Sequence, residues 1–366
     1  MLAPAGRHGV DTELGVIEGY YGGPWTWEER AGLVSFLAPH GYRFHLYAPK
    51  ADAYLRRRWR ELHPDQEADS IRAFAAHCRA AGVRFGVGLS PLKIFNDFNA
   101  EARDALARKL AHLDSLGVQD LGILFDDMRG DLPDLAQTQL RVVDFVAGHT
   151  AATRLIVCPT YYTDDPVLDR VFGQRPEGYL RALGQGLDPA IGVFWTGEEV
   201  CAREYGLGHL ARVGEDLRRK PILWDNYPVN DGPRMSPYLH LRAFTGRPAA
   251  IARLIGGHAI NPALQPVLTR IPALTLAESY RMGEAHEYGQ AFARAAALAL
   301  GEDLGGKVAR RLGTLNDVGL DNLGEAEPRL REAFAGIDHD GAREIIAWLD
   351  GRYRFSKAML DAEAFG

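Results

Sequence analysis

Eight short apolar runs rich in β-forming residues recur along the chain at intervals of roughly 30 to 40 residues, and this repeat constrains the fold most strongly. The stretches between them have helical periodicity, and one stretch, Thr26–Leu37, begins with a capping box of Thr26 and Glu29. Strands that alternate with helices are typical of βαβ units, which build a parallel sheet. The predicted strands are Leu14–Tyr21, Tyr42–Ala48, Val83–Leu89, Leu121–Phe125, Arg154–Cys158, Ile191–Trp195, Pro221–Trp224 and Ile251–Ala259.

The number and length of these units predict an α/β fold, a (β/α)8 TIM barrel over residues 1–270. A doubly wound open sheet is the competing architecture, but it usually carries a glycine-rich phosphate loop after its first strand, and none is present here. The eighth unit stays open, because Ala249–Ile260 also fits a helix that runs into a short strand.

The character of the chain changes after about Ile271, where strand-like runs stop. We therefore predict a smaller C-terminal helical bundle over residues 271–366, packed beside the barrel. Its apolar stripes indicate a core, and they could also mediate a homodimer. The predicted helices are Leu274–Leu300, Leu304–Leu315, Ala326–Phe334 and Gly341–Leu360.

Composition excludes several classes of function. A net charge of -6 gives no nucleic-acid footprint. We interpret the basic run Arg56–Arg60 as a solvated loop or helix face, and the alternative is a phosphate or acidic-substrate site. The three cysteines include no CxxC pair and no HxH occurs, so we expect no disulfide framework, no metal and no cofactor. No apolar stretch approaches membrane-spanning length, and Met1–His8 lacks the apolar core of a secretion signal. We therefore expect a cytoplasmic protein without a membrane partner.

Two adjacent carboxylates, Asp126 and Asp127, directly follow the fourth predicted strand. Active-site residues of such barrels stand at the C-terminal ends of the strands. Buried carboxylates are costly unless they are paired or used, and adjacent like charges push one pKa upward. A carboxyl that stays protonated near neutral pH can act as a general acid. The pair is therefore a catalytic candidate, and the alternative is a structural role as a helix cap.

The ends of the other predicted strands carry aromatic and polar residues. Trp and Tyr faces stack on sugar rings, while Asp, Asn and Lys bind hydroxyl groups, so this mouth favours a carbohydrate ligand and glycoside hydrolysis. One of Tyr20 and Tyr21 should face the site and the other the barrel wall. Trp195 and Trp224 are candidates for sugar contact, with core packing as the alternative.

Six motifs in order resemble glycoside hydrolase family 84, the β-N-acetylglucosaminidases that include the protein O-GlcNAcases. The resemblance spans residues 14 to about 262 and implies retaining hydrolysis of terminal GlcNAc. In that mechanism the substrate's own 2-acetamido oxygen attacks the anomeric carbon and forms an oxazoline. The motifs are Gly15–Gly22, Tyr47–Lys50, Phe125–Asp127, Cys158–Thr160, Trp195–Gly197 and Trp224–Asn226.

The resemblance also implies roles for individual residues. Asp126 would hold the acetamido N–H, Asp127 would act as general acid and then base, and Tyr162 would bond near the reacting centre. Trp224 would wall the acetyl pocket. The remaining substrate contacts would come from the Gly19 carbonyl, Lys50, Asn226, Asp231 and Asn261.

The spacing of the two aspartates agrees with this division. Retention by a protein nucleophile needs a second carboxylate across the scissile bond, about 5 Å from the acid, and consecutive residues cannot easily flank a bond. The expected partner is a GlcNAc-bearing glycoprotein or glycan. The alternatives are a non-catalytic GlcNAc-binding barrel and a hexosaminidase that acts on glycan or chitin fragments.

Overall fold

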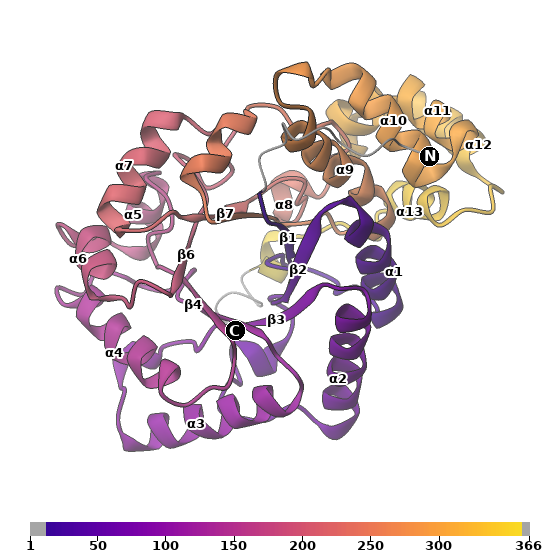
Figure 1. The fold of residues 1–366 in the computed structure, drawn as a ribbon. Helices are drawn as coiled ribbons and strands as arrows, with labels where there is room; N and C mark the ends of the chain where they lie inside the picture. Colours follow the sequence, from indigo (N-terminus) through magenta and orange to yellow (C-terminus); the bar gives the residue numbers. More distant parts are fainter. Residues whose placement is uncertain (1–11, 361–366) are drawn as a thin grey trace.

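The computed structural model describes residues 12–360, and its centre is a closed barrel of eight parallel strands in sequence order (Figure 1). Strand β8 pairs with β1 and closes the barrel. The (β/α)8 prediction is therefore confirmed. The strands are β1 (Leu14–Ile17), β2 (Tyr42–Tyr47), β3 (Arg84–Leu89), β4 (Asp120–Leu124), β5 (Arg154–Cys158), β6 (Gly192–Trp195), β7 (Ile222–Asp225) and β8 (Gly257–Ile260).

Helices form a ring outside the strands, as Figure 1 shows. The capping box predicted for the first helix is present: the Thr26 hydroxyl accepts from the Glu29 N–H at 3.2 Å, and Glu29 Oε2 accepts from the Thr26 N–H at 2.7 Å. The ring helices are α1 (Trp27–Leu37), α2 (Asp65–Ala80), α3 (Ala100–Ser115), α4 (Leu135–Ala147), α5 (Val167–Phe172), α6 (Tyr179–Gly186) and α7 (Leu207–Leu217).

The first and eighth units depart from simple strands. β1 ends at Ile17 and not at Tyr21, because the Gly19 N–H turns back onto the Ile17 carbonyl at 2.8 Å. Between β7 and β8 the chain makes a short helix, α8 (Gly232–Met235), and a 3-10 turn over Ala249–Leu254. The second reading of the eighth unit, a helix that runs into a short strand, is thus confirmed. The short strands leave long loops at the barrel mouth.

The C-terminal helices gather at one side of the barrel, near α1 (Figure 1). The prediction of one helix from Leu274 to Leu300 is wrong, because Gly283 adopts a left-handed φ of 57° and divides it. The last predicted helix likewise ends at Leu349, shortly before Gly351 with φ of 73°. The helices are α9 (Pro266–Met282), α10 (Tyr288–Leu300), α11 (Glu302–Arg310), α12 (Ala326–Phe334) and α13 (Asp340–Leu349).

Helix α9 joins the barrel and the bundle. Ile271 packs in the apolar core of the bundle, whereas Ala273 and Leu276 pack in the cluster that includes β1 and β8 residues. The helix therefore runs through residue 270, where we placed the end of the barrel, and that domain boundary stays a prediction.

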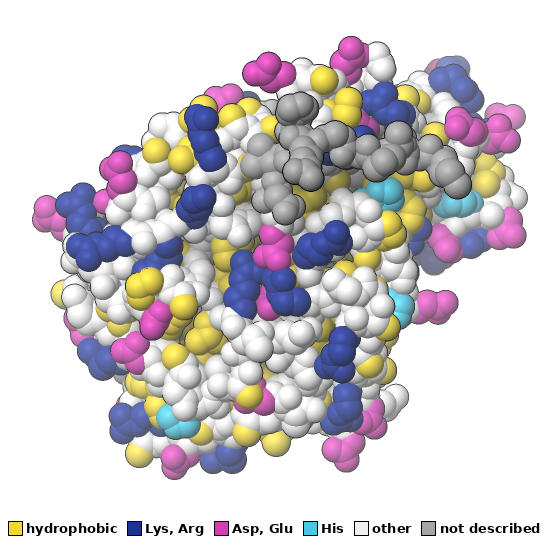
Figure 2. All heavy atoms as spheres, in the orientation of Figure 1, with side chains coloured by type: hydrophobic (Ala, Val, Ile, Leu, Met, Phe, Trp, Pro, Cys, Tyr) yellow, Lys and Arg dark blue, Asp and Glu magenta, His cyan; other side chains and the backbone are white. Residues whose placement is uncertain are grey.

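The surface charges and the lengths of the helices relate to the expectations about net charge, membrane contact and location. On the face in Figure 2, acidic and basic side chains are interspersed, in keeping with the small net charge. Between residues 12 and 360, no helix is both long and apolar enough to cross a membrane. The N-terminal segment behind the cytoplasmic expectation lies outside the described residues.

Candidate active site

One pocket of roughly 670 Å³, open to solvent, lies where the C-terminal ends of the strands meet. Every strand except β3 contributes to its wall, either directly or through the loop that follows. Nine of the ten predicted site residues line it: Gly19, Lys50, Asp126, Asp127, Tyr162, Trp224, Asn226, Asp231 and Asn261. The remaining lining residues are Tyr21, Cys158, Thr196, Val200, Cys201, Val229 and Met235.

Lys50 joins the two adjacent carboxylates. Its ammonium forms an ion pair with Asp126 Oδ2 and lies 3.8 Å from Asp127 Oδ2. The other oxygen, Asp126 Oδ1, is buried and has no hydrogen-bond partner among the described residues. A buried acceptor without a donor is costly, so Oδ1 is available to a donor on a bound ligand.

Asp127 is held in an uncommon backbone conformation. Its φ of 56° lies in the left-handed region, which residues other than glycine seldom adopt and which is often found at functional sites. Two tyrosines hold its carboxylate: Tyr21 OH donates to Oδ2 at 2.7 Å and Tyr162 OH to Oδ1 at 3.5 Å. Tyr21 therefore faces the pocket, whereas Tyr20 donates to Glu18 in the barrel wall at 2.9 Å.

Nearby positive charge sets the protonation state of Asp127. Burial would raise the pKa of this carboxyl, but the charges of Lys50 and Arg56 and the two tyrosine hydroxyls together hold the pKa below its usual range. The expectation that one pKa within the pair is raised is thus wrong for Asp127. It is Asp231 whose pKa is raised, to about 6, by burial and then by the charge of Asp127.

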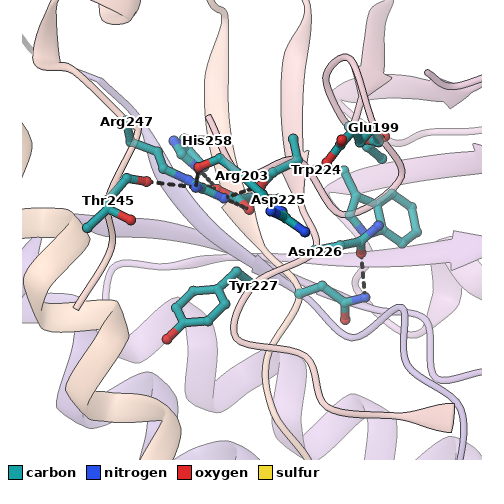
Figure 3. Close-up of polar contacts among 12 residues, drawn as sticks. Glu199, Arg203, Trp224, Asp225, Asn226, Tyr227, Thr245, Arg247 and His258 are labelled. Carbon is teal, nitrogen blue, oxygen red and sulfur yellow. Dashed lines mark hydrogen bonds and ion pairs between the residues drawn. The ribbon is translucent and has the colours of Figure 1, made fainter. Parts of the chain in front are cut away.

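Trp224 and two asparagines form the next part of the wall, beside Lys50, whose Nζ lies 5.9 Å from the centroid of the Trp224 ring. The Trp224 indole N–H donates to Asn226 Oδ1 at 3.1 Å, and Asn261 Nδ2 donates to the same oxygen at 3.0 Å. Asn261 Oδ1 in turn accepts from the Gly19 N–H at 3.2 Å. Figure 3 shows Trp224 and Asn226 side by side at the end of β7. These bonds fix the indole and both amides before any ligand binds.

Gly19 is required by the close approach of Trp224. A Cβ at position 19 would lie 2.0 Å from Trp224 Cζ2, which no packed structure tolerates. We expect Gly19→Ala to displace the indole and to lower kcat/KM by roughly 10²-fold, because small misplacements in a site are costly. Steady-state kinetics check this, with Gly23→Ala as control, since a Cβ there meets nothing within 4 Å. Equal activity of both variants would contradict the role of Gly19.

Asp225 supports the site from behind and does not line the pocket. It accepts two hydrogen bonds from Arg247, at 2.8 and 2.7 Å, and lies 3.0 Å from His258 Nε2 (Figure 3). Arg247 also donates to backbone carbonyls of the loop after β6, including those of Ala202 and Arg203. This ion pair therefore ties that loop to the end of β7, directly beside Asn226.

Trp195 is the predicted residue that the pocket leaves out. It is buried, and its indole N–H donates to His209 Nε2 of α7 at 3.0 Å. Side chains alternate along a strand, and it is the preceding Phe194 that packs against Trp224, with ring centroids 5.3 Å apart. Trp195 therefore packs between the barrel and the helix ring, away from the pocket.

Several pocket residues carried no signal in the sequence. Val200 and Cys201 come from the loop after β6, and Met235 comes from the short helix α8. The course of these segments depends on distant contacts, such as the bond from Asn226 Nδ2 to the Val200 carbonyl at 2.8 Å. Cys158, a free and buried thiol, also lines the pocket. No group of three or more His, Cys, Asp or Glu within residues 12–360 is arranged to hold a metal ion.

A (β/α)8 barrel that gathers two adjacent carboxylates, a lysine, a tryptophan and amides at its strand ends has the fold and site of a glycoside hydrolase. Residues 14–312 match the family model described as beta-N-acetylglucosaminidase. The chain belongs to this family, which confirms the resemblance seen in the sequence.

Named relatives agree with the family assignment. The chain is 29% identical over 276 residues to protein O-GlcNAcase of Mus musculus and of Rattus norvegicus, a match that covers 73% of this chain and 30% of each relative. The chain thus spans less than a third of the length of these curated relatives. It also superposes on a mutant O-GlcNAc hydrolase of Thermobaculum terrenum with a TM-score of 0.79 and 28% identity, covering 93% of this chain and 80% of the other.

Proposed function

We propose that the chain is a retaining exo-β-N-acetylglucosaminidase of O-GlcNAcase type, which removes terminal GlcNAc by substrate-assisted catalysis through an oxazoline intermediate. One observation carries the proposal: Asp126 and Asp127 reach the same ammonium of Lys50, and Asp126 Oδ1 is left without a donor. Two carboxylates on one side of a ligand fit a leaving-group acid and an acetamide acceptor. They do not fit an acid and a nucleophile on opposite faces of the sugar.

In the first step Asp126 Oδ1 accepts the hydrogen bond of the substrate's acetamido N–H. The acetamido oxygen then bonds to the anomeric carbon, and the bond from that carbon to the glycosidic oxygen breaks as Asp127 gives its proton to the leaving oxygen. The oxazoline that forms carries developing positive charge, which the Asp126 carboxylate stabilises. Tyr162 donates near the reacting centre, where its hydroxyl already points at Asp127.

In the second step Asp127 acts as the base. Its carboxylate takes a proton from water while the water oxygen attacks the anomeric carbon, and the oxazoline reopens to the acetamide with the original configuration. Both tyrosine hydroxyls stay protonated throughout, because burial and then the Asp127 charge raise the pKa of Tyr21 and of Tyr162 well above the usual range. They therefore serve Asp127 as fixed donors.

The other pocket residues hold the sugar. The Trp224 indole walls the acetyl group, and Asn226 contacts the acetamido or ring region. Asp231, which accepts the Tyr21 N–H at 2.7 Å, binds the O4 and O6 hydroxyls with Asn261 beside it. Lys50 and the Gly19 carbonyl bind further hydroxyls. A bound sugar excludes water from this pocket. Loss of water disfavours the ionised carboxylate, so Asp127 is protonated more readily when the substrate is bound.

Hydrolysis of p-nitrophenyl GlcNAc, compared with the GalNAc and glucose analogues, tests the proposal. We expect turnover of the GlcNAc glycoside and a loss of at least about 10³-fold on the glucose analogue, because an intramolecular nucleophile is then missing. Binding of GlcNAc without turnover would instead indicate a non-catalytic barrel. Comparable rates on GlcNAc and glucose glycosides would contradict participation of the acetamido group.

A further inference from the structure

Arg56 lies buried behind the carboxylate pair, although it belongs to the basic run that we interpreted as solvated. Only 1% of its surface is exposed. Arg58, two residues further on, is half exposed and pairs with the exposed Glu61. The solvated-face prediction is therefore wrong for Arg56. It fits Arg58, so one run holds both a buried and an exposed arginine.

The Arg56 guanidinium has few partners for a buried charge. Across residues 12–360 no carboxylate forms an ion pair with it, and its Nε and Nη1 atoms are buried without a hydrogen-bond partner. Its Nη2 donates to the backbone carbonyl of Asp127 at 3.4 Å. Burial of an unpaired charge is costly. A charge in this position acts electrostatically on the carboxylates of Asp127 and Asp126.

The turn that carries Arg56 is rigidly placed between β2 and β3. The Ser90 N–H at the end of β3 donates to the Leu55 carbonyl at 2.8 Å, and the Arg56 N–H donates to the Ala53 carbonyl at 3.2 Å. Asp52 caps this turn by accepting from the Tyr54 N–H at 2.9 Å. The end of β3, which does not line the pocket, thus supports the turn that presents Arg56.

We propose that Arg56 is a positioning residue for Asp127, through its hydrogen bond to the Asp127 carbonyl and through its unpaired charge. The bond restrains the left-handed backbone that aims the Asp127 carboxylate into the pocket. The charge stabilises the ionised carboxylates of the pair. This inference rests on the proposed function, because it assigns Arg56 to the acid of that reaction.

Several other titratable or charged groups face Asp127 besides Arg56. A substitution of Arg56 leaves all of them in place. Burial and then the Asp127 charge raise the pKa of Tyr21 and of Tyr162 well above the usual range, so both hydroxyls are neutral donors, and burial raises the pKa of Asp231 to about 6. Removing Arg56 therefore takes away one positive charge and leaves the rest of this set in place. The facing groups are Lys50 from the loop after β2, Asp126 from the loop after β4, Tyr21 from the loop after β1, Cys158 and Tyr162 from β5 and its loop, and Asp231 from the loop after β7.

The test is the pH dependence of kcat/KM on p-nitrophenyl GlcNAc for wild type, Arg56→Met and Arg56→Lys. Neighbouring acids titrate as a pair, so the acidic and basic limbs of the pH profile report apparent pKa values of Asp126 and Asp127 together. Loss of a positive charge disfavours the ionised carboxylates, so both limbs should move to higher pH, by about one pH unit in Arg56→Met. Arg56→Lys keeps the charge, so its limbs should stay in place while kcat falls a few-fold, because the planar donor to the Asp127 carbonyl is lost. Arg58→Met, an exposed change in the same run, should match wild type.

Thermal melting of each variant separates a folding defect from a change in the site. A folded Arg56→Met enzyme whose limbs coincide with those of wild type would overturn the inference. If Arg56→Met does not fold, Arg56→Lys decides: lower kcat with wild-type melting supports the inference, and wild-type kcat overturns it. An inactive wild type would instead contradict the proposed function, so the two failures are distinguishable.

Discussion

Asp127→Asn is expected to slow the hydrolysis of GlcNAc glycosides with poor leaving groups by roughly 10²–10⁴-fold, because an amide cannot protonate the departing oxygen. Aryl glycosides with acidic phenols should lose much less in the step that forms the oxazoline, since such phenols leave without protonation. The measurement is kcat/KM on phenyl GlcNAc, whose phenol is a poor leaving group, and on dinitrophenyl GlcNAc. The ratio of the two rates should therefore change sharply in favour of the dinitrophenyl substrate.

A control on the same loop separates this effect from a general disturbance. Asp131 follows the same strand, carries no pocket contact and pairs with the exposed Arg129, so Asp131→Asn should behave like wild type on both substrates. Equal losses on both substrates in Asp127→Asn would argue against the acid role. They would indicate instead that Asp127 binds the sugar or holds the fold of the loop.

Asp126→Asn is expected to slow both substrates alike, by roughly 10²–10³-fold, because it removes the charge that stabilises the acetamido group in the transition state. The change also breaks the ion pair with Lys50. The leaving group does not contact Asp126 in this account, so its acidity should not matter. The same two aryl glycosides measure this prediction, with kcat/KM plotted against the phenol pKa.

The comparison of the two variants is the informative result. Wild-type turnover of the dinitrophenyl substrate by Asp126→Asn would remove Asp126 from the mechanism. A leaving-group dependence as steep as that of Asp127→Asn would mean that the two acids share one role. The circular dichroism spectrum of each variant should match that of wild type, because both changes are isosteric and lie at the end of a strand.

Much of the fold could be read from the sequence, because strand cores and helix caps are local signals. The capping box at Thr26 fixes where α1 begins, and the apolar run before Asp126 fixes β4. The helix breaks in the bundle were harder to predict. A single glycine with positive φ, Gly283, divides α9 from α10, and a glycine within an alanine- and leucine-rich stretch can equally continue a helix.

The site was predictable where residues stand directly at strand ends, and less so elsewhere. Barrel geometry alone brings Lys50, Asp126 and Asn226 together, because each follows its own strand. The direction of side chains was harder to predict. Successive side chains of a strand point to opposite faces, so Trp195, the neighbour of the inward-facing Phe194, points outward to the helix ring. The buried position of Arg56 depends on Ser90 from a neighbouring unit, a contact with no local signature.

The division of labour between Asp126 and Asp127 is the central claim. A crystal structure of the Asp127→Asn variant with a bound GlcNAc glycoside tests it most directly. We expect Asp126 Oδ1 within about 3.2 Å of the acetamido nitrogen and the residue-127 side chain at a similar distance from the glycosidic oxygen. A complex in which both side chains lie far from the anomeric centre, or in which another carboxylate approaches the acetamide, would contradict it.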